Sequence, residues 1–128
     1  MNGLTLDTGA LIAYERFDRE VVALLARATR NDATVTVPAG VLAQAIRDPA
    51  RQARTSKLVR QTNTRVSPLD RGAAIQVGRL LAASRTSDVV DAQVVLCARE
   101  ADDMIVTTDP RDLPRLDPGA RLFVLGKL

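Results

Sequence analysis

Histidine is absent from this chain of 128 residues, and cysteine and aromatic residues are scarce. Without histidine, the chain cannot use a histidine general base, a histidine zinc ligand or a Ser-His-Asp triad. Any bound metal must be held by oxygen ligands, which favours Mg²⁺, Mn²⁺ or Ca²⁺. The single cysteine, Cys97, cannot form an internal disulfide, and this fits an intracellular location. Aromatic residues make up 2% of the chain, so aliphatic side chains must fill the core.

Long hydrophobic runs are also missing. The apolar runs are far shorter than a membrane span requires, and Asp7 falls where the apolar region of a signal peptide would lie. We therefore expect a cytoplasmic protein that does not enter the membrane. The length and an apolar content of 46% predict one domain over residues 1–128 with a sizeable core.

The charged residues are unevenly distributed, although the net charge is only +3. Seven basic residues lie in the segment Arg47–Arg71, and eight acidic residues lie in the segment Asp88–Asp117. A basic middle and an acidic last third indicate a polyanionic partner and a cation site in one molecule. Solvated helix faces would produce the same pattern, and for the basic segment this alternative stays open.

Strand-like and helix-like patterns alternate along the chain. The predicted strands are residues 3–6, 33–37, 64–67, 104–107 and 121–125. The predicted helices are residues 11–30 with an interruption near Asp18, 39–47, 51–61, 70–83 and 88–100. We also expect a tight turn at Thr8-Gly9 and a loop over residues 114–119. This alternation predicts an α/β fold in which helices cover both faces of a mostly parallel sheet.

Acidic residues follow two of these predicted strands. Asp7 comes directly after the first strand and Asp109 directly after the fourth. Ligands of open α/β sheets bind at the carboxyl ends of the strands, so these carboxylates meet if the two strands are neighbours. Asp88 and Asp91 lie three residues apart in the first turn of the preceding helix, on one helix face. Converging carboxylates without histidine suit Mg²⁺ or Mn²⁺, because like charges repel strongly without a cation.

Several of these carboxylates also have a simpler interpretation. Asp7 can cap the helix that follows it, and its own stretch leaves capping and metal binding equally open. Asp88 is most simply the N-cap of its helix. Asp91 has no such role, because it lies inside the helix in an otherwise apolar stretch. Asp112 can cap the turn after Asp109 or bind a metal-bound water.

Four stretches together resemble the PIN domain, and within it the VapC-like toxins of bacterial toxin–antitoxin pairs. They are LDTGALI at 6–12, VPAGVLAQ at 37–44, TSDVVDA at 86–92 and VTTDPRDL at 106–113. The resemblance covers nearly the whole chain. It implies a three-layer α/β/α sandwich with a parallel sheet in the order 3-2-1-4-5. It also implies a Mg²⁺- or Mn²⁺-dependent endoribonuclease, a homodimer, and inhibition by a cognate antitoxin protein.

By position, the acids Asp7, Asp91 and Asp109 match the first, third and fourth acids of this family, and Asp112 matches a frequent additional one. The second acid of the family is usually a glutamate, and here Gln44 stands in its place. A neutral amide should lower the metal affinity. An alternative function is therefore a PIN domain with weakened catalysis that mainly binds RNA or an antitoxin.

Two further sets of residues are candidates for the site. Asp48, one turn further along the predicted helix of Gln44, is a possible substitute for the missing glutamate. Three arginines are expected on roughly one side of the predicted helices between residues 39 and 61 and are candidates for holding the RNA backbone: Arg47, Arg51 and Arg54. Contacts of this kind would make RNA binding fall steeply with salt.

Overall fold

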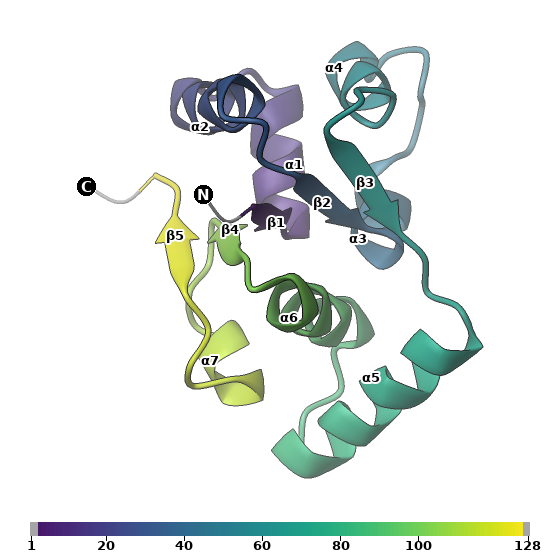
Figure 1. The fold of residues 1–128 in the computed structure, drawn as a ribbon. Helices are drawn as coiled ribbons and strands as arrows, with labels where there is room; N and C mark the ends of the chain where they lie inside the picture. Colours follow the sequence, from purple (N-terminus) through teal and green to yellow (C-terminus); the bar gives the residue numbers. More distant parts are fainter. Residues whose placement is uncertain (1–2, 127–128) are drawn as a thin grey trace.

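Strands and helices alternate through residues 3–126, the part of the chain that this computed structural model describes. The strands are β1 (Leu4–Leu6), β2 (Val35–Pro38), β3 (Thr64–Ser67), β4 (Met104–Thr107) and β5 (Leu122–Val124) (Figure 1). The helices are α1 (Thr8–Glu15), α2 (Arg19–Arg30), α3 (Ala39–Ala45), α4 (Ala53–Leu58), α5 (Arg71–Ser84), α6 (Val89–Ala101) and α7 (Leu113–Leu116). Within this part of the chain, no helix is long and apolar enough to cross a membrane.

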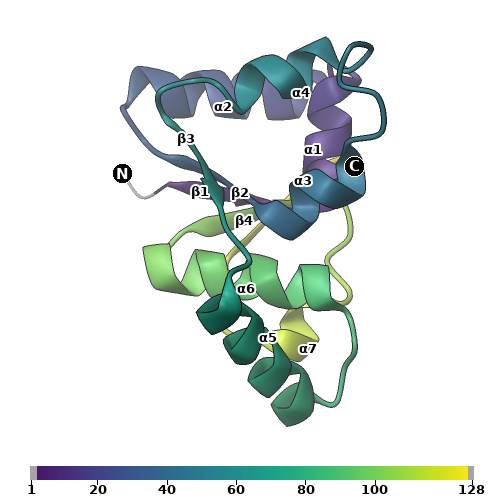
Figure 2. The ribbon, with the colours of Figure 1, turned by 90° about the vertical axis from the view of Figure 1, so that its right-hand side faces the viewer.

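The five strands form one parallel sheet in the order β3-β2-β1-β4-β5. The central strand β1 pairs with β2 and β4, so that Leu4 lies opposite Val35 and Met104. Helices α1 to α4 cover one face of the sheet and α5 to α7 the other (Figure 2). This arrangement confirms the predicted three-layer α/β/α fold and its strand order.

An aliphatic core lies between the sheet and the two helix layers. Leu6, Val37 and Val106, from three neighbouring strands, are fully buried, and α6 packs against β1, β2 and β4. Helix α6 contributes Val94 and Val95 to this core. The buried strands are mostly apolar, and their buried polar members, Thr5, Thr36 and Thr107, are uncharged. A buried carboxyl group directly after β1, as at Asp7, therefore requires an explanation.

The start of the chain differs from the prediction at one point. There is no separate turn at Thr8-Gly9, because β1 passes directly into α1 through Asp7, whose side chain caps the helix. The interruption predicted near Asp18 is confirmed. Helix α1 ends at Glu15, Phe17 takes a left-handed backbone conformation with φ of 58°, and Asp18 caps α2.

The segment between β2 and β3 is also less helical than predicted. Helix α3 ends at Ala45, before Arg47, and α4 covers only Ala53–Leu58. The side chain of Gln52 accounts for the break, because its Oε1 accepts hydrogen bonds from the backbone N–H groups of Arg47 and Asp48. Asp48 therefore lies beyond the end of the helix of Gln44, contrary to the expectation that placed it on that helix.

The predicted loop over residues 114–119 is partly helical. Its first residues belong to the short helix α7, which begins at Leu113 and ends at Leu116. Both of these leucines are buried, and proline in the first turn of a helix needs no N–H partner. Burial of the two leucines stabilises this short helix, which the sequence pattern did not predict.

Candidate metal centre

Asp7 lies where β1 ends, and this residue is only 8% exposed. Its Oδ1 accepts a hydrogen bond from the backbone N–H of Ala10 at 2.8 Å, so Asp7 does cap α1. Burial raises the pKa of Asp7, and the negative charge of Asp109 adds to this effect. The Thr107 hydroxyl and the Ala10 N–H act in the opposite direction and lower the pKa. Asp7 is thus a helix cap and also a buried carboxyl group beside a second acid.

Asp91 lies in the first turn of α6, half-buried among other acids. Desolvation is the main cause that raises its pKa to about 6, and the charges of four further carboxylates raise it as well. These carboxylates belong to Asp88, Asp7, Asp112 and Asp109. The side chain of Asp88 also caps α6, accepting a hydrogen bond from the Asp91 N–H at 2.9 Å, as its simpler interpretation predicted. The fold therefore brings the predicted acids into one electrostatic cluster.

Asp109 is held in a tight turn after β4. The Thr107 hydroxyl accepts a hydrogen bond from the Asp109 N–H at 3.0 Å. Both carboxylate oxygens of Asp109 are engaged by Arg111, whose Nε lies 3.0 Å from Oδ1 and whose terminal nitrogen lies 2.9 Å from Oδ2. Hydrogen bonds from Arg111 lower the pKa of Asp109 to about 2. Neither Arg111 nor Thr107 was among the residues predicted from the sequence.

Gln44 and Asp112 lie at the edges of this cluster. The side chain of Gln44 reaches the start of α1, where its Oε1 accepts a hydrogen bond from the Thr8 hydroxyl, one residue after Asp7. Asp112 stands at the N-cap position of α7, but its side chain makes no capping hydrogen bond. Instead it lines a cavity of about 330 Å³ together with Asp88 and Asp91. This placement favours the second interpretation of Asp112, a role beside the other acids.

The donor set suits a hard divalent cation. Oxygen atoms of carboxylates are the ligands that Mg²⁺ and Mn²⁺ prefer, and a cation would relieve the repulsion that raises the pKa of Asp91. Within residues 3–126, however, no three acidic side chains converge closely enough to ligate one ion as they stand. Asp109 would have to share its oxygens with Arg111 or release them to join Asp7 and Asp91.

The sequence model of the PIN domain family matches residues 4–117. The chain belongs to the PIN domain family. Members of this family are nucleases, so the assignment implies nuclease chemistry. Among curated proteins, none matches the chain closely enough to count as a relative.

Solved structures resemble this PIN domain over almost its full length. One is VapBC2 from Rickettsia felis bound to a DNA fragment from their promoter, with 15% identity, a TM-score of 0.71, and coverage of 97% of this chain and 98% of that chain. Another is FitAcB from Neisseria gonorrhoeae, with 16% identity, a TM-score of 0.64, and coverage of 94% and 96%. FitAB bound to an IR36 DNA fragment has 14% identity, a TM-score of 0.64, and coverage of 94% of both chains. At these identities the likeness shows the fold alone.

The three arginines predicted to bind RNA do not share one helix face. Arg47 donates to the backbone oxygens of Ala43 and Ile46 at the end of α3, and Arg51 forms an exposed ion pair with Asp48 at 3.4 Å. Arg54 lies on α4, with its guanidinium 4.6 Å from the centre of the Phe17 ring. All three side chains are exposed. The PIN domain thus presents them separately on the α1–α4 layer.

Stability should fall as the pH rises from about 4 to about 6, because folding raises the pKa of Asp91 from its ordinary 3.8 to about 6. In this range the folded state keeps a proton that the unfolded state has lost. We expect the free energy of unfolding to fall by on the order of 1–2 kcal/mol, after allowance for solvent screening of a half-buried group. Thermal unfolding of wild type and Asp91→Asn across pH 4–7 measures this loss, and equal pH slopes for the two proteins would exclude it.

Gly9 in α1 packs closely against the loop that carries Asp109. A Cβ atom at Gly9 would lie 2.0 Å from Oγ1 and 3.2 Å from Cβ of Thr108. Gly9→Ala should therefore lower the free energy of unfolding by about 1–3 kcal/mol, as overpacking does. The control is Gly78→Ala in α5, where nothing lies within 4 Å and alanine favours the helix. Urea unfolding of both variants gives the comparison, and equal stability would show that the loop yields without cost.

Proposed function

We propose that this PIN domain is a Mg²⁺- or Mn²⁺-dependent endoribonuclease that hydrolyses RNA phosphodiester bonds as the toxin of a toxin–antitoxin pair. The observation that carries the proposal is the acidic cluster, in which Asp7 and Asp109 follow the adjacent strands β1 and β4 and Asp91 faces both from α6. Burial and mutual repulsion of these carboxyl groups are costly unless the cluster binds a cation.

In this mechanism Asp7, Asp91 and Asp109 are the catalytic and metal-holding residues, and Asp112 assists from the rim. When bound, a divalent ion lowers the pKa of a water and neutralises the charge that develops on the phosphate. The chain itself holds the carboxylates in position. The Ala10 N–H orients Asp7, and the turn through Thr107 orients Asp109. Arg111 keeps Asp109 ionised, and as a guanidinium it can exchange this carboxylate for a phosphate oxygen.

RNA is the proposed substrate because the α1–α4 layer carries exposed basic side chains, which attract a phosphate backbone. Arg47, Arg51 and Arg54 are proposed to contact the RNA backbone. The ion pair of Arg51 with Asp48 is solvent-exposed, and such pairs contribute little, so a phosphate group can displace the aspartate. The likeness to VapBC2 and FitAB supports an antitoxin partner, and we extend the proposal to a cytoplasmic homodimer.

Gln44 favours a second candidate function. Its amide is neutral where a charged acid is usual in the family, its oxygen bonds to the Thr8 hydroxyl next to Asp7, and fewer charged ligands mean weaker binding of a divalent ion. The second candidate is therefore a PIN domain with weakened catalysis that acts mainly as an RNA- or antitoxin-binding module.

Incubation of the purified chain with end-labelled RNA distinguishes the two functions. If the chain is a metal-dependent nuclease, defined RNA fragments form in Mg²⁺ or Mn²⁺ and none form in EDTA. RNA that stays intact with both metals, while a filter-binding assay still detects the complex, would favour the module. Fragments that form equally in EDTA would contradict a metal-dependent nuclease and indicate a contaminant.

A further inference from the structure

Phe17 is the one aromatic side chain that stands out from the surface. The chain has two phenylalanines and one tyrosine, and Phe17 is 52% exposed while Tyr14 and Phe123 are partly buried. An exposed ring of this size loses the free energy that burial would give it. The composition indicates that this chain has almost no other ring for stacking against a ligand.

The backbone at Phe17 makes the presence of a large side chain more unusual. The N–H of Phe17 bonds to the oxygen of Tyr14, and the N–H of Asp18 bonds to the oxygen of Ala13, both at 3.0 Å. These two bonds form a Schellman motif that ends α1, and its left-handed position normally holds glycine. Phe17 occupies this position with φ of 58°. The turn would be more stable with glycine, so the turn does not explain the ring.

One face of the Phe17 ring carries a positive charge. The guanidinium of Arg54 lies 4.6 Å from the ring centre, and its terminal nitrogen also donates to the Glu15 backbone oxygen at 3.3 Å. The Glu15 carboxylate is engaged by the Thr55 N–H at 3.0 Å. Arg54 therefore stacks on Phe17 without a carboxylate partner in the described part of the chain. Nucleobases stack both on aromatic rings and on guanidinium planes, so Phe17 and Arg54 together offer two surfaces of this kind.

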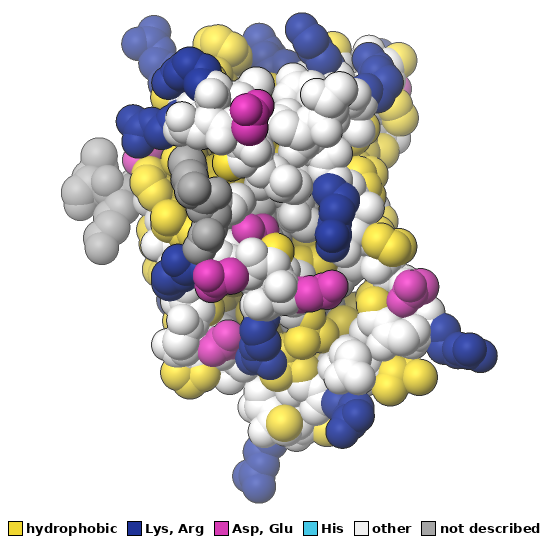
Figure 3. Space-filling model, in the orientation of Figure 1, with side chains coloured by type: hydrophobic (Ala, Val, Ile, Leu, Met, Phe, Trp, Pro, Cys, Tyr) yellow, Lys and Arg dark blue, Asp and Glu magenta, His cyan; other side chains and the backbone are white. Residues whose placement is uncertain are grey.

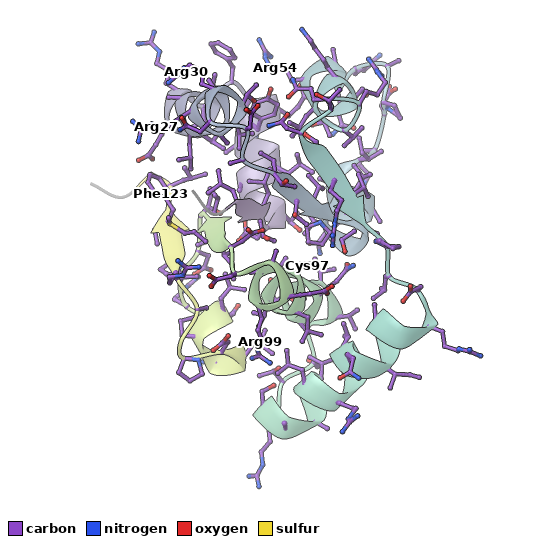
Figure 4. All side chains as sticks on the ribbon, viewed as in Figure 1. Arg27, Arg30, Arg54, Cys97, Arg99 and Phe123 are labelled. Atoms are coloured by element: carbon purple, nitrogen blue, oxygen red, sulfur yellow. The ribbon has the colours of Figure 1, made fainter. Side chains whose placement is uncertain are left out.

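The surroundings of this pair are basic. Nine exposed basic side chains lie between residues 8 and 61, against five acidic side chains, of which three are exposed and two half-buried. The basic residues are Arg16, Arg19, Arg27, Arg30, Arg47, Arg51, Arg54, Lys57 and Arg60. Figure 3 shows Lys and Arg side chains gathered over the outer side of the α1–α4 layer, and Figure 4 places Arg54 there, away from the sheet. A basic surface of this kind attracts a polyanion.

Helix α1 connects this pair to the acidic cluster. Asp7 caps one end of the helix and Phe17 follows the other end, ten residues later. At 1.5 Å per residue this separation is about 15 Å, a length that about four stacked nucleotides span at 3.4 Å each. In Figure 2, α1 rises from the sheet toward α4, so a strand of RNA along it would connect the two places.

From these observations we propose that Phe17 and Arg54 form a stacking platform for an unpaired base of single-stranded RNA, a few nucleotides from the phosphate at the acidic cluster. The proposal rests on RNA as the substrate class. Stacking on an aromatic side chain is tolerant of sequence, and its loss on alanine substitution weakens a complex with a single strand by about 5- to 150-fold. The platform therefore positions RNA without selecting a sequence.

The absence of tryptophan allows a direct test, because Phe17→Trp introduces the only tryptophan in the chain. The experiment uses the full chain with Asp7→Asn and EDTA, so that RNA is bound without being cut. A 12-nucleotide unpaired RNA should quench the fluorescence of the new tryptophan, whereas inorganic polyphosphate should not. The matched control, Phe123→Trp on β5 at the opposite sheet edge from β3, should show no quenching.

A second variant separates stacking from packing. Phe17→Gly should leave the melting temperature unchanged or raise it, since glycine suits the left-handed position. It should weaken RNA binding, measured by fluorescence anisotropy, by about 5- to 150-fold. A lower melting temperature with unchanged RNA affinity would overturn the proposal, because Phe17 would then only pack. RNA that binds without quenching the tryptophan at position 17 would overturn it as well, and would direct attention to a protein partner at this face.

These results are independent of the proposed nuclease activity. If RNA quenches the tryptophan at position 17 but wild type cuts no RNA with Mg²⁺ or Mn²⁺, the platform stands and the nuclease function fails. If wild type cuts RNA and Phe17→Gly binds it with unchanged affinity, the nuclease stands and the platform fails.

Discussion

Replacement of Asp7 by asparagine is expected to lower metal-dependent RNA cleavage by about 100-fold or more while the fold stays intact. Loss of a group that merely supports a metal ligand costs 10- to 100-fold, and Asp7 is proposed to bind the ion directly. Asparagine keeps the oxygen that caps the helix by accepting from the Ala10 N–H. It also removes a buried carboxyl group whose pKa is raised by burial, so the substitution should not destabilise the fold. Single-turnover cleavage of labelled RNA gives the rate, and circular dichroism verifies the fold.

Asp103→Asn is the matched control for this experiment. Asp103 is also buried, at 6% exposure, and burial likewise raises its pKa. It lies before β4, at the amino end of the sheet, where the Thr5 hydroxyl donates to it at 2.9 Å. Cleavage by Asp103→Asn should equal that of wild type. If both variants lose activity alike, buried charge in general matters and Asp7 has no special role.

Replacement of Gln44 by glutamate should raise the affinity for Mg²⁺ about tenfold, which corresponds to about 1.4 kcal/mol. Glutamate has nearly the same shape, and its oxygen can still accept the hydrogen bond from the Thr8 hydroxyl. The added charge increases repulsion within the acidic cluster, and only a cation relieves it. We therefore expect a lower melting temperature than wild type in EDTA and a larger rise on addition of Mg²⁺. Isothermal titration calorimetry measures the affinity.

A second charge-adding variant tests whether position matters. Gln76→Glu adds the same charge to an exposed site on α5, where Gln76 lines a different cavity from the acids. Its affinity for Mg²⁺ should match that of wild type. Equal gains in both variants would mean that Gln44 acts only through net charge and lies outside the metal site.

The strands and the carboxylates that follow them were predictable because their signals are local, whereas the pairing of β1 with β4 was implied by the resemblance to the PIN domain. An apolar run followed within two residues by aspartate, as at Asp7 and Asp109, indicates both a buried strand and the position of its carboxyl end. Parallel pairing then places these residues at one edge. Asp91 was recognisable because a carboxyl group inside an apolar helix stretch has no local partner.

The contacts that refine the site were not predictable, because they depend on side-chain geometry across the fold. The bidentate pair of Arg111 with Asp109 spans two residues, yet the same sequence could equally point the arginine to solvent. Gln52 ends the helical pattern before Arg47 by binding backbone groups, and no periodicity records such a bond. The exposed ring of Phe17 is similar, since an apolar residue that belongs to an apolar pattern at helical spacing is expected to be buried.

Anomalous diffraction from a crystal soaked in Mn²⁺ tests the central claim most directly, because it locates the ion without relying on activity. The proposed metal centre predicts a strong anomalous peak among the carboxylates of Asp7, Asp91 and Asp109, lost in Asp7→Asn. It also predicts that Asp109 shares or leaves its contact with Arg111. A peak elsewhere, or none at saturating Mn²⁺ with Asp109 still held by Arg111, would contradict a metal centre at the carboxyl ends of β1 and β4.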